Sequence, residues 1–220
     1  MAQKQRTNQA ITLKGSTALV TEFFEYSVNS ILYQRGVYPS DDFRMVKKYG
    51  LPMLVTADDN LKEYLSTILS QVQEWLLASS INRLVLAIKS IETGETLERW
   101  QFDIHTDESA INNPSLPGGP KGSSTTGKKK EKTEKEVQGE IREIMKQITS
   151  SVTFLPILEE ECTFTLLAYT NDSPEMPVPA TWGDADPHLI DRGKVEQVRL
   201  RSFSTNVHSL EAMVAYRVGE

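Results

Sequence analysis

The sequence predicts an α+β domain in which three helices pack on a mostly antiparallel sheet. Apolar residues recur at helical spacing in three stretches, and short β-branched or alternating runs fill most of the remaining chain. The 220 residues are only 39% hydrophobic, because a stretch rich in Pro, Gly, Ser and Lys interrupts this pattern. We therefore expect a single domain over residues 1–220 that contains a flexible polar loop at residues 106–135.

The first two helices are predicted from their apolar patterns and their end signals. The first should run from Ser16, as N-cap, to about Gln34, with Gly36 ending it. Its apolar face is so wide that we expect burial on most sides. The second follows Asn60, which with Glu63 resembles a capping box. Its inner stripe consists of Leu61, Leu65, Ile68, Val72 and Trp75.

The third helix is predicted directly after the polar loop. Its spacing places Lys146 on the outer face, away from the apolar residues. The inner stripe consists of Val137, Ile141, Ile144 and Ile148.

Six stretches are predicted as strands. Residues 81–91 and 96–104 should form a hairpin through the turn sequence ETGE. Residues 151–157 contain Pro156, which indicates an edge strand or a strand end. The remaining strands are expected at residues 161–170, 195–208 and 212–218, with a long proline-containing connection at 171–194.

One carboxylate in the predicted strand 96–104 shares a face with large apolar residues. Alternation places Glu98 on the same side as Trp100 and Phe102. A buried carboxylate is costly unless it is paired. Arg35, at the end of the first helix, is the natural partner, so we predict a structural ion pair between Arg35 and Glu98.

No catalytic or metal-binding motif is recognisable in the sequence. His105, His188 and His208 are far apart and should lie at the surface or be half-buried. The single cysteine, Cys162, lies in an alternating strand and should pack as a small hydrophobic residue. We therefore expect no catalytic residue, no metal and no cofactor. An enzyme that uses Glu98 or Cys162 remains an alternative, although neither has a partnered motif.

Charge and hydropathy exclude further classes of function. The net charge of −6, from 24 basic and 30 acidic residues, argues against nucleic acid as a partner. No apolar run approaches the length of a membrane-spanning helix, and the first residues lack the apolar stretch of a secretory signal. We expect a soluble intracellular protein that contacts neither nucleic acid nor membrane.

The last two predicted strands have mixed faces. Val198 and Leu200 alternate with Arg199 and Arg201, so neither face is plainly apolar and the pairing register is weakly specified. On its long tether this strand pair could occupy more than one position in the sheet. A free sheet edge could then capture an extended peptide. An ordinary C-terminal hairpin is the alternative, and the residue pattern by itself favours it.

Several segments together resemble the HORMA-domain family, and within it the proteins of the spindle assembly checkpoint. The similarity is collinear over nearly the whole chain. Its most specific parts are ILYQRGVYP, LERWQFDI and QITSSVTFLP. The similar segments are residues 10–39, 47–56, 92–104, 141–160 and 198–216.

The resemblance implies a HORMA-like fold and a non-enzymatic adaptor that switches between open and closed conformers. In the closed state a mobile C-terminal safety belt, residues 171–220 here, encloses a partner peptide that pairs with one edge strand. The implied peptide-binding edge is Thr163, Phe164, Thr165, Leu166, Leu167, Ala168 and Tyr169. The implied safety-belt residues are Trp182, Val198, Leu200, Phe203, Val207, Leu210, Met213 and Tyr216.

The resemblance also implies a self-association surface and a conformational switch. The surface comprises Lys146, Gln147 and Phe154. Lys146 stands where animal relatives have Arg, and it keeps the charge without the planar fork of a guanidinium. Leu13 matches a position in the N-terminal segment that shifts during conversion between the conformers. Leu210 stands where the family has a Val in the last hairpin, a position that affects the balance between the open and closed conformers.

The implied partners all belong to mitotic control. They are the coiled-coil kinetochore receptor (mitotic-arrest-deficient protein one), the activator subunit of the anaphase-promoting complex, other mitotic checkpoint complex subunits, a second copy of the chain in an open–closed dimer, and a remodelling ATPase with its HORMA adaptor. The implied locations are the nucleus and cytoplasm, with kinetochores and the nuclear envelope in mitosis. The alternative within the family is a HORMA adaptor for DNA repair or meiotic chromosome axes that captures other peptides.

Overall fold

The computed structural model describes residues 11–112, 131–171 and 178–218. The helices are α1 (Leu13–Gln34), α2 (Asp59–Leu77), α3 (Glu108–Asn112) and α4 (Glu134–Ser150), with 3₁₀ turns at Ser40–Asp42 and Ser151–Thr153. The strands are β1 (Phe43–Lys48), β2 (Leu51–Thr56), β3 (Ile81–Ser90), β4 (Thr96–Thr106), β5 (Cys162–Thr170), β6 (Lys194–Arg199), β7 (Phe203–Ser204) and β8 (His208–Val218).

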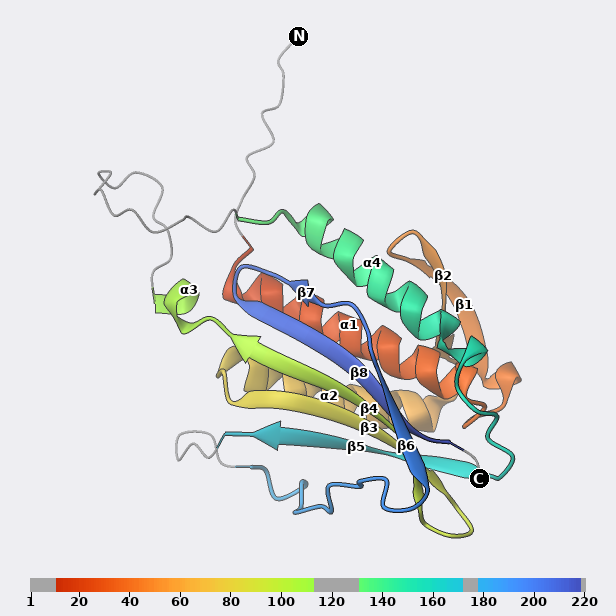
Figure 1. Cartoon of the computed structure of the whole chain (residues 1–220). Coiled ribbons are helices and arrows are strands. Elements are labelled where there is room, and N and C mark those ends of the chain that lie inside the picture. Colours follow the sequence, from red (N-terminus) through yellow and green to blue (C-terminus); the bar gives the residue numbers. More distant parts are fainter. Residues whose placement is uncertain (1–10, 113–130, 172–177, 219–220) are drawn as a thin grey trace, which may run out of the picture.

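A six-stranded antiparallel sheet forms the centre of the molecule (Figure 1). Its strand order is β5-β3-β4-β8-β6, and the short β7 pairs with β8. Helices α1 and α2 cover one face, and α4 packs beside α1 (Figure 1). The last long strand, β8, therefore lies inside the sheet and not at its edge.

Helix α1 begins earlier than the sequence pattern predicts. Its N-cap is Thr12, whose hydroxyl accepts a hydrogen bond from the amide of Gly15 at 3.2 Å. The prediction of Ser16 as N-cap is wrong, since Ser16 is fully buried within the helix. The predicted end is confirmed: Gly36 adopts a φ of 65°, and its amide donates to the Tyr33 carbonyl at 3.1 Å.

The N-cap of helix α2 lies two residues before the predicted capping residue. The carboxylate of Asp58 accepts a hydrogen bond from the amide of Leu61 at 2.7 Å, so Asp58, and not Asn60, is the N-cap. Helix α4 begins with a true capping box between Thr133 and Glu136. The predicted inner stripes of both helices are buried, and Lys146 is exposed on the outer face of α4.

Strands β1 and β2 form a hairpin that the sequence pattern did not predict. Tyr49 and Gly50 have φ values of 53° and 73° at its turn, which is typical of a type I′ turn. A Tyr-Gly pair is a weak signal for this turn, and Pro52 interrupts the run that follows. The amide of Thr56 donates to the Asn29 side chain at 2.7 Å and so attaches the hairpin to α1.

Three further expectations need correction. Residues 151–157 form no strand, because the chain makes a 3₁₀ turn after α4, and Ser151 is buried with its hydroxyl donating to the Ile148 carbonyl at 2.7 Å. The predicted strand 195–208 is divided into β6 and β7. The polar loop predicted at 106–135 includes the end of β4, α3 and the start of α4, while its middle, 113–130, lies outside the described residues.

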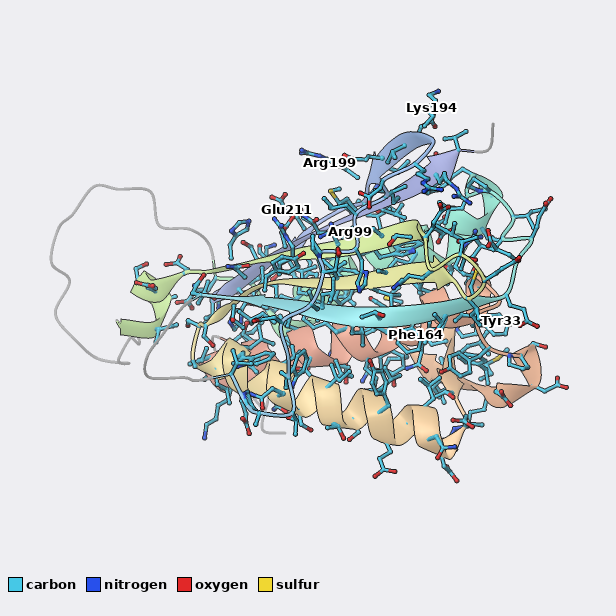
Figure 2. The ribbon with its side chains drawn as sticks, turned by 90° about the horizontal axis from the view of Figure 1, so that it is seen from below. Tyr33, Arg99, Phe164, Lys194, Arg199 and Glu211 are labelled. Carbon is cyan, nitrogen blue, oxygen red and sulfur yellow. The ribbon has the colours of Figure 1, made fainter. Side chains whose placement is uncertain are left out.

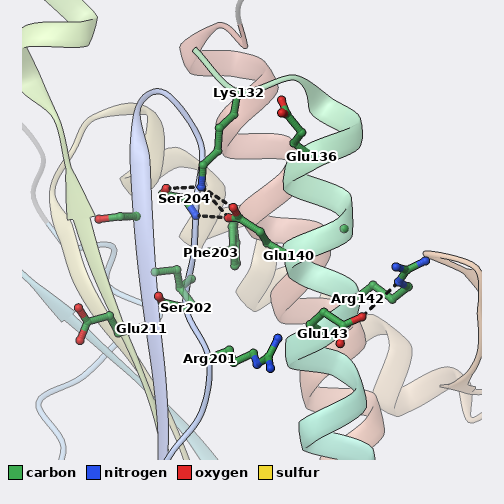
Figure 3. Close-up of a pocket in the computed structure, with 13 residues that line it drawn as sticks. Lys132, Glu136, Glu140, Arg142, Glu143, Arg201, Ser202, Phe203, Ser204 and Glu211 are labelled. Atoms are coloured by element: carbon green, nitrogen blue, oxygen red, sulfur yellow. Dashed lines mark hydrogen bonds and ion pairs between the residues drawn. The ribbon is translucent and has the colours of Figure 1, made fainter. Parts of the chain in front are cut away.

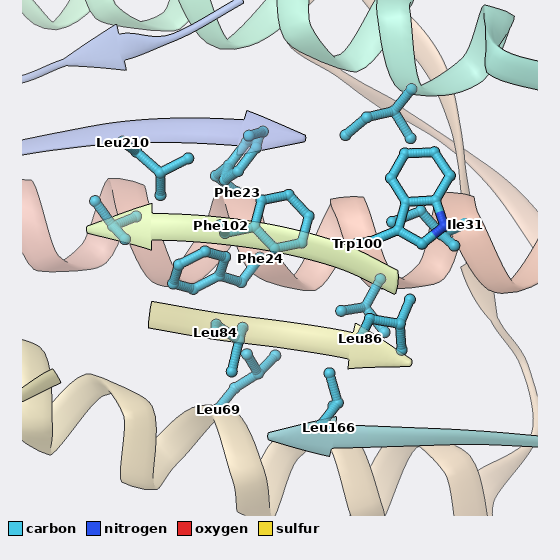
Figure 4. Close-up of a cluster of buried hydrophobic side chains, with 14 of the residues drawn as sticks. Phe23, Phe24, Ile31, Leu69, Leu84, Leu86, Trp100, Phe102, Leu166 and Leu210 are labelled. Carbon is cyan, nitrogen blue, oxygen red and sulfur yellow. The ribbon is translucent and has the colours of Figure 1, made fainter. Parts of the chain in front are cut away.

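The core fills the space between the sheet and the helices (Figure 4). Aromatic rings connect α1 to two strands: Phe23 lies 5.8 Å from Phe102 of β4 and 5.1 Å from Phe203 of β7, between ring centroids, both in edge-on arrangements. Trp75 and Trp100 are each 1% exposed, in agreement with core packing. Within the described residues, no helix combines the length and the apolar character needed to span a membrane.

The predicted ion pair between Arg35 and Glu98 is present at the end of α1. The Nε atom of Arg35 donates to Glu98 Oε1 at 2.8 Å, and Nη2 lies 2.5 Å from the same oxygen. Both side chains are buried. Arg35 also donates to the Pro156 carbonyl, and Trp100 Nε1 donates to Glu98 at 3.2 Å. Burial raises the pKa of Glu98, although Arg35 opposes this shift.

Candidate functional site

Strand β5 forms one edge of the central sheet. Among the described residues it pairs with β3 alone, in a register that sets Leu86 opposite Leu166 and Ala87 opposite Thr165. The seven residues predicted for a peptide-binding edge therefore share one strand whose other side has no strand partner in the described chain. Leu166 and Leu167 are buried, Thr163 is exposed, and Phe164, Thr165, Ala168 and Tyr169 are half-buried.

The chain crosses the sheet beside this edge through residues 178–193, which we call the crossing segment. Trp182 of the crossing segment meets Trp75 of α2 edge-on, with 4.8 Å between ring centroids. A cavity of about 670 Å³ lies between the crossing segment and β5. It is lined on one side by residues 166–170 and on the other by residues 178–180 and 182–187, and Trp75 also lines it.

The outer face of the sheet supports the crossing segment through Arg99 of β4. Its Nη1 donates to Gln101 at 2.5 Å, its Nη2 to the Tyr169 hydroxyl at 3.3 Å, and its Nε to the Pro187 carbonyl at 3.4 Å. Figure 2 shows Arg99 on the face of the sheet opposite the helices, while Phe164 of β5 points toward them. This face is therefore covered by chain at Pro187, in agreement with the burial of Arg99.

The C-terminal strands lie on the side of the sheet away from β5. Strand β8 pairs with β4 over nine residues, with Phe102 opposite Ala212, and with β6, where Val198 is opposite Val214. Of the predicted safety-belt residues, Phe203, Val207, Leu210 and Tyr216 are buried, and Trp182, Val198, Leu200 and Met213 are half-buried. Residues 172–177 and 219–220 of the predicted belt lie outside the described residues.

The predicted self-association residues are close to these C-terminal strands. Gln147 of α4 accepts a hydrogen bond from the amide of Arg201 at 2.6 Å. The Phe154 ring is 42% exposed and lies 6.2 Å from the Tyr216 ring of β8, between centroids. Lys146 pairs with Glu143 at 2.9 Å on the exposed face of α4. The three residues thus lie around one end of α4, and two of them contact the C-terminal region.

A second contact joins the beginning of α4 to β7 (Figure 3). Lys132 Nζ lies 2.6 Å from Glu140 Oε1 and 2.8 Å from the Ser204 hydroxyl, and the Ser204 amide donates to Glu140 at 3.1 Å. A cavity of about 640 Å³ lies between α4 and this strand, lined by charges of both signs that include Arg142 and Glu211.

The two predicted switch residues lie in different elements. Leu13 is the first residue of α1 and is half-buried. Leu210 is fully buried in β8, in register with Ile104 of β4 and Phe203 of β7. A polar side chain at position 210 would therefore face the core in this arrangement.

His208 is buried, whereas the sequence pattern predicted that it would lie at the surface or be half-buried. It is 1% exposed at the start of β8, and its Nδ1 lies 2.6 Å from the Ser16 hydroxyl. The Ser16 hydroxyl is also 2.6 Å from Oγ1 of Thr205. Burial lowers the pKa of His208 from its usual 6.5 to about 4. No pattern in the sequence connects residues almost 200 positions apart, so this cluster could not be predicted.

The two other histidines and the single cysteine are less deeply buried than His208. His105 is exposed and His188 half-buried, in agreement with the expectation. Cys162 is half-buried, and its thiol donates to the Glu160 carbonyl at 3.3 Å. Burial raises the pKa of this thiol, which disfavours the reactive thiolate. In residues 11–112, 131–171 and 178–218, no group of three or more His, Cys, Asp or Glu could hold a metal ion.

Comparison with known proteins is consistent with this architecture. The HORMA domain family model matches residues 16–208. The chain is 46% identical over 217 residues to the mitotic spindle assembly checkpoint protein MAD2A of Mus musculus, covering 99% of this chain and 98% of that protein. It is 49% identical to the MAD2A protein of Dictyostelium discoideum, over 99% and 97% of the two chains.

A solved structure shares the fold. A chain in a crystal structure of the mitotic checkpoint complex is 45% identical and superposes with a TM-score of 0.77, covering 93% of this chain and all of that one. The α+β architecture, with its helices on one face of a six-stranded sheet and its C-terminal strands beside β4, is thus that of a HORMA domain. The chain belongs to the HORMA-domain family and, within it, to the MAD2 spindle assembly checkpoint proteins.

Proposed function

We propose that this checkpoint protein is an adaptor that captures an extended peptide as an additional strand on β5. The observation that carries the proposal is the edge of β5 beneath the crossing segment, which no strand of the described residues occupies, while β8 pairs with β4 on the other side of the sheet. A free edge offers backbone donors and acceptors to an incoming strand, and the neighbouring cavity can receive its side chains. The activity needs no chemical reaction on the ligand.

The path of the chain gives this capture an unusual topology. The crossing segment leaves the β5 side, passes over the sheet and continues into β6, which pairs with β8, which in turn pairs with β4. A peptide lying on β5 would therefore be enclosed by a loop of chain closed by strand pairing. Its dissociation would require either sliding out lengthwise or separation of those strands, so we expect slow release.

We also propose that the C-terminal region has a second, open position. The mixed faces of residues 198–201 specify register weakly, and the long connection before them provides the length for relocation. In the open conformer these strands would cover the β5 edge, as the family resemblance implies, and peptide capture would require their transfer to β4. Leu13 and Leu210 would affect this balance through packing that differs between the two positions.

The proposed ligands are segments of the kinetochore receptor and of the activator subunit of the anaphase-promoting complex. Capture of the activator, together with assembly with other subunits of the mitotic checkpoint complex, would delay anaphase. The related chain with 45% identity comes from that complex, which supports this assignment. The surface around Lys146, Gln147 and Phe154 would serve for self-association and for the adaptor of the remodelling ATPase.

Direct measurement of peptide capture tests the proposal. Synthetic peptides covering the trapping segments of the receptor and the activator would be titrated into the chain by calorimetry, beside closure segments of meiotic-axis and DNA-repair proteins. We expect tight, slow binding of the first two peptides alone. Tight binding of only the second pair would replace the checkpoint function with the alternative adaptor function, and binding of none would contradict peptide capture.

One variant tests the location of the bound peptide. Ala168 lines the cavity beside β5, so Ala168→Trp should fill it and weaken binding by at least about tenfold. Thr67→Trp, on the exposed face of α2, is the matched control and should bind like the wild type. Equal binding by the wild-type protein and the Ala168→Trp variant would place the peptide elsewhere.

A further inference from the structure

An ion-pair junction lies where the crossing segment ends. Glu95, in the turn between β3 and β4, faces two arginines: its Oε1 lies 2.9 Å from Arg192 Nη1, and its Oε2 lies 2.7 Å from Arg217 Nη1. Arg192 is near the end of the crossing segment and Arg217 is near the end of β8. A single carboxylate therefore joins three parts of the chain that are far apart in sequence.

The junction is packed as well as paired. Gly193, with a φ of 80°, follows Arg192 and lies against the stem of Arg217: a Cβ atom at this position would come within 3.1 Å of Arg217 Cγ. Glu160, just before β5, is 3.6 Å from Arg217 Nη2. The backbone therefore turns closely over Arg217 at the point where β6 begins to pair with the end of β8.

The surroundings make Glu95 the central charge of this junction. A polar cavity of about 480 Å³ lies beneath the crossing segment, and Lys89, Asp186 and Asp191 line it together with Glu95 and both arginines. Glu95 is about one quarter exposed and Arg192 is mostly exposed. The pairs are therefore accessible to solvent and sensitive to salt, whereas the strand pairing beside them is not.

We propose that Glu95 is a latch that sets how fast the crossing segment and β6 separate from the sheet. For the crossing segment to lift, Arg192 must leave Glu95. For β8 to leave β4, Arg217 must leave it as well. Through the proposed function, the same latch sets how fast a captured peptide is released. The opening step itself is a property of the chain without ligand, so it can be tested independently of peptide capture.

The direct test is hydrogen exchange on the ligand-free chain. Glu95→Gln keeps the size and the backbone of the turn but removes the charge. We expect the amides of β6, together with those of the last residues of β8, to exchange about three- to tenfold faster, while the amides of β3 are unchanged. Asp59→Asn, which removes one exposed pair with Lys62 on α2, is the matched control and should change neither set.

Salt and a double-mutant cycle make the test specific to the ion pairs. Raising NaCl from about 0.05 to about 0.5 M should accelerate β6 exchange in the wild type but much less in Glu95→Gln. Arg192→Gln should give a smaller acceleration, and its effect should be largely absent in the Glu95→Gln background. Unchanged β6 exchange in Glu95→Gln, or fully additive effects of the two substitutions, would overturn the latch.

The dissociation rate of a bound peptide is a second measurement, and it distinguishes failure of the latch from failure of peptide capture. With the receptor peptide bound, Glu95→Gln should raise the dissociation rate by about three- to tenfold and leave the association rate nearly unchanged. If the wild type captures the peptide but Glu95→Gln releases it at the wild-type rate and shows wild-type β6 exchange, the latch is wrong and peptide capture stands. If the wild type captures no peptide while β6 exchange responds to Glu95→Gln, the latch stands and the proposed function fails.

Discussion

The Oγ atom of Ser16, in the first turns of α1, lies 2.6 Å from Nδ1 of His208, the first residue of β8. Thr205 completes the cluster, since its hydroxyl contacts Ser16 and accepts hydrogen bonds from the amides of Val207 and His208. The hydrogen bond joins the beginning of the fold to its last strand. It attaches the start of β8, which pairs with β4, to the first turns of α1.

Acidification should weaken this arrangement through His208. Because burial lowers the pKa of His208 from 6.5 to about 4, the unfolded chain binds more protons at this residue than the folded chain does. Its contribution to stability is complete above pH 6.5 and is lost as the pH falls toward 4. Between about pH 7.5 and about pH 5.5 we expect a loss of ~1.4 kcal/mol in the free energy of unfolding, measured by urea denaturation.

The variant His208→Asn isolates this effect from the other titrating groups. It should lower the free energy of unfolding at neutral pH and remove most of the difference between the two pH values. His105→Asn, at an exposed histidine, should retain the wild-type pH dependence. If His208→Asn and the wild type lose stability equally on acidification, then burial of His208 does not govern the response.

Arg35→Ala should destabilise the fold severely. It would leave the carboxylate of Glu98 buried without its partner and the Pro156 carbonyl without its donor. We expect a loss of about 3–5 kcal/mol in the free energy of unfolding, the range for breaking a buried ion pair. Arg44→Ala, at an exposed arginine of β1, should change it by less than about 0.5 kcal/mol. An equally small loss in Arg35→Ala would mean that the pair contributes nothing.

Trp182→Ala should affect ligand release more than stability. Trp182 is half-buried and attaches the crossing segment to Trp75 beside the β5 cavity. Its loss should increase the dissociation rate of a captured peptide by about tenfold or more, measured by surface plasmon resonance. Leu189→Ala, at an exposed residue of the same segment, is the control. Equal release rates for both variants and the wild type would exclude Trp182 from retention.

Phe154→Ala should weaken self-association. Phe154 is 42% exposed beside the end of α4, and its ring packs in a tilted arrangement against the ring of Tyr216. We expect at least about a tenfold weaker dimer by sedimentation velocity, with a smaller effect for Lys146→Ala. Gln147→Ala should, in addition, loosen residues 201–204, because Gln147 binds the Arg201 amide. A dimer unchanged by Phe154→Ala would place the interface elsewhere.

The long elements could be predicted because local pattern determines them. The buried stripes of α2 and α4, the β3–β4 hairpin and the ion pair between Arg35 and Glu98 all follow from periodicity or from the cost of an unpaired charge. The wrong predictions concern positions where the local sequence offers several equally good residues for the same role. Thr12 and Ser16 are both good N-cap residues; Thr12 caps α1, while the Ser16 hydroxyl contacts His208.

The position of the C-terminal strands could not be predicted from the residue pattern. Neither face of residues 198–201 is plainly apolar, so the pattern does not distinguish pairing beside β4 from pairing beside β5. The contacts that accompany this position join distant segments: His208 with Ser16, and Glu95 with Arg192 and Arg217. For the same reason Arg99 was not predicted to be buried, since only the crossing segment covers it.

The central claim is that a peptide is held on β5 while β8 remains beside β4. Backbone nuclear Overhauser effects in the isotope-labelled complex test it most directly. We expect contacts from the peptide to residues 163–169 together with retained contacts between Phe102 and Ala212, which are opposite each other in the β4–β8 register. Peptide contacts confined to other elements, or contacts between β8 and β5 in the bound state, would contradict it.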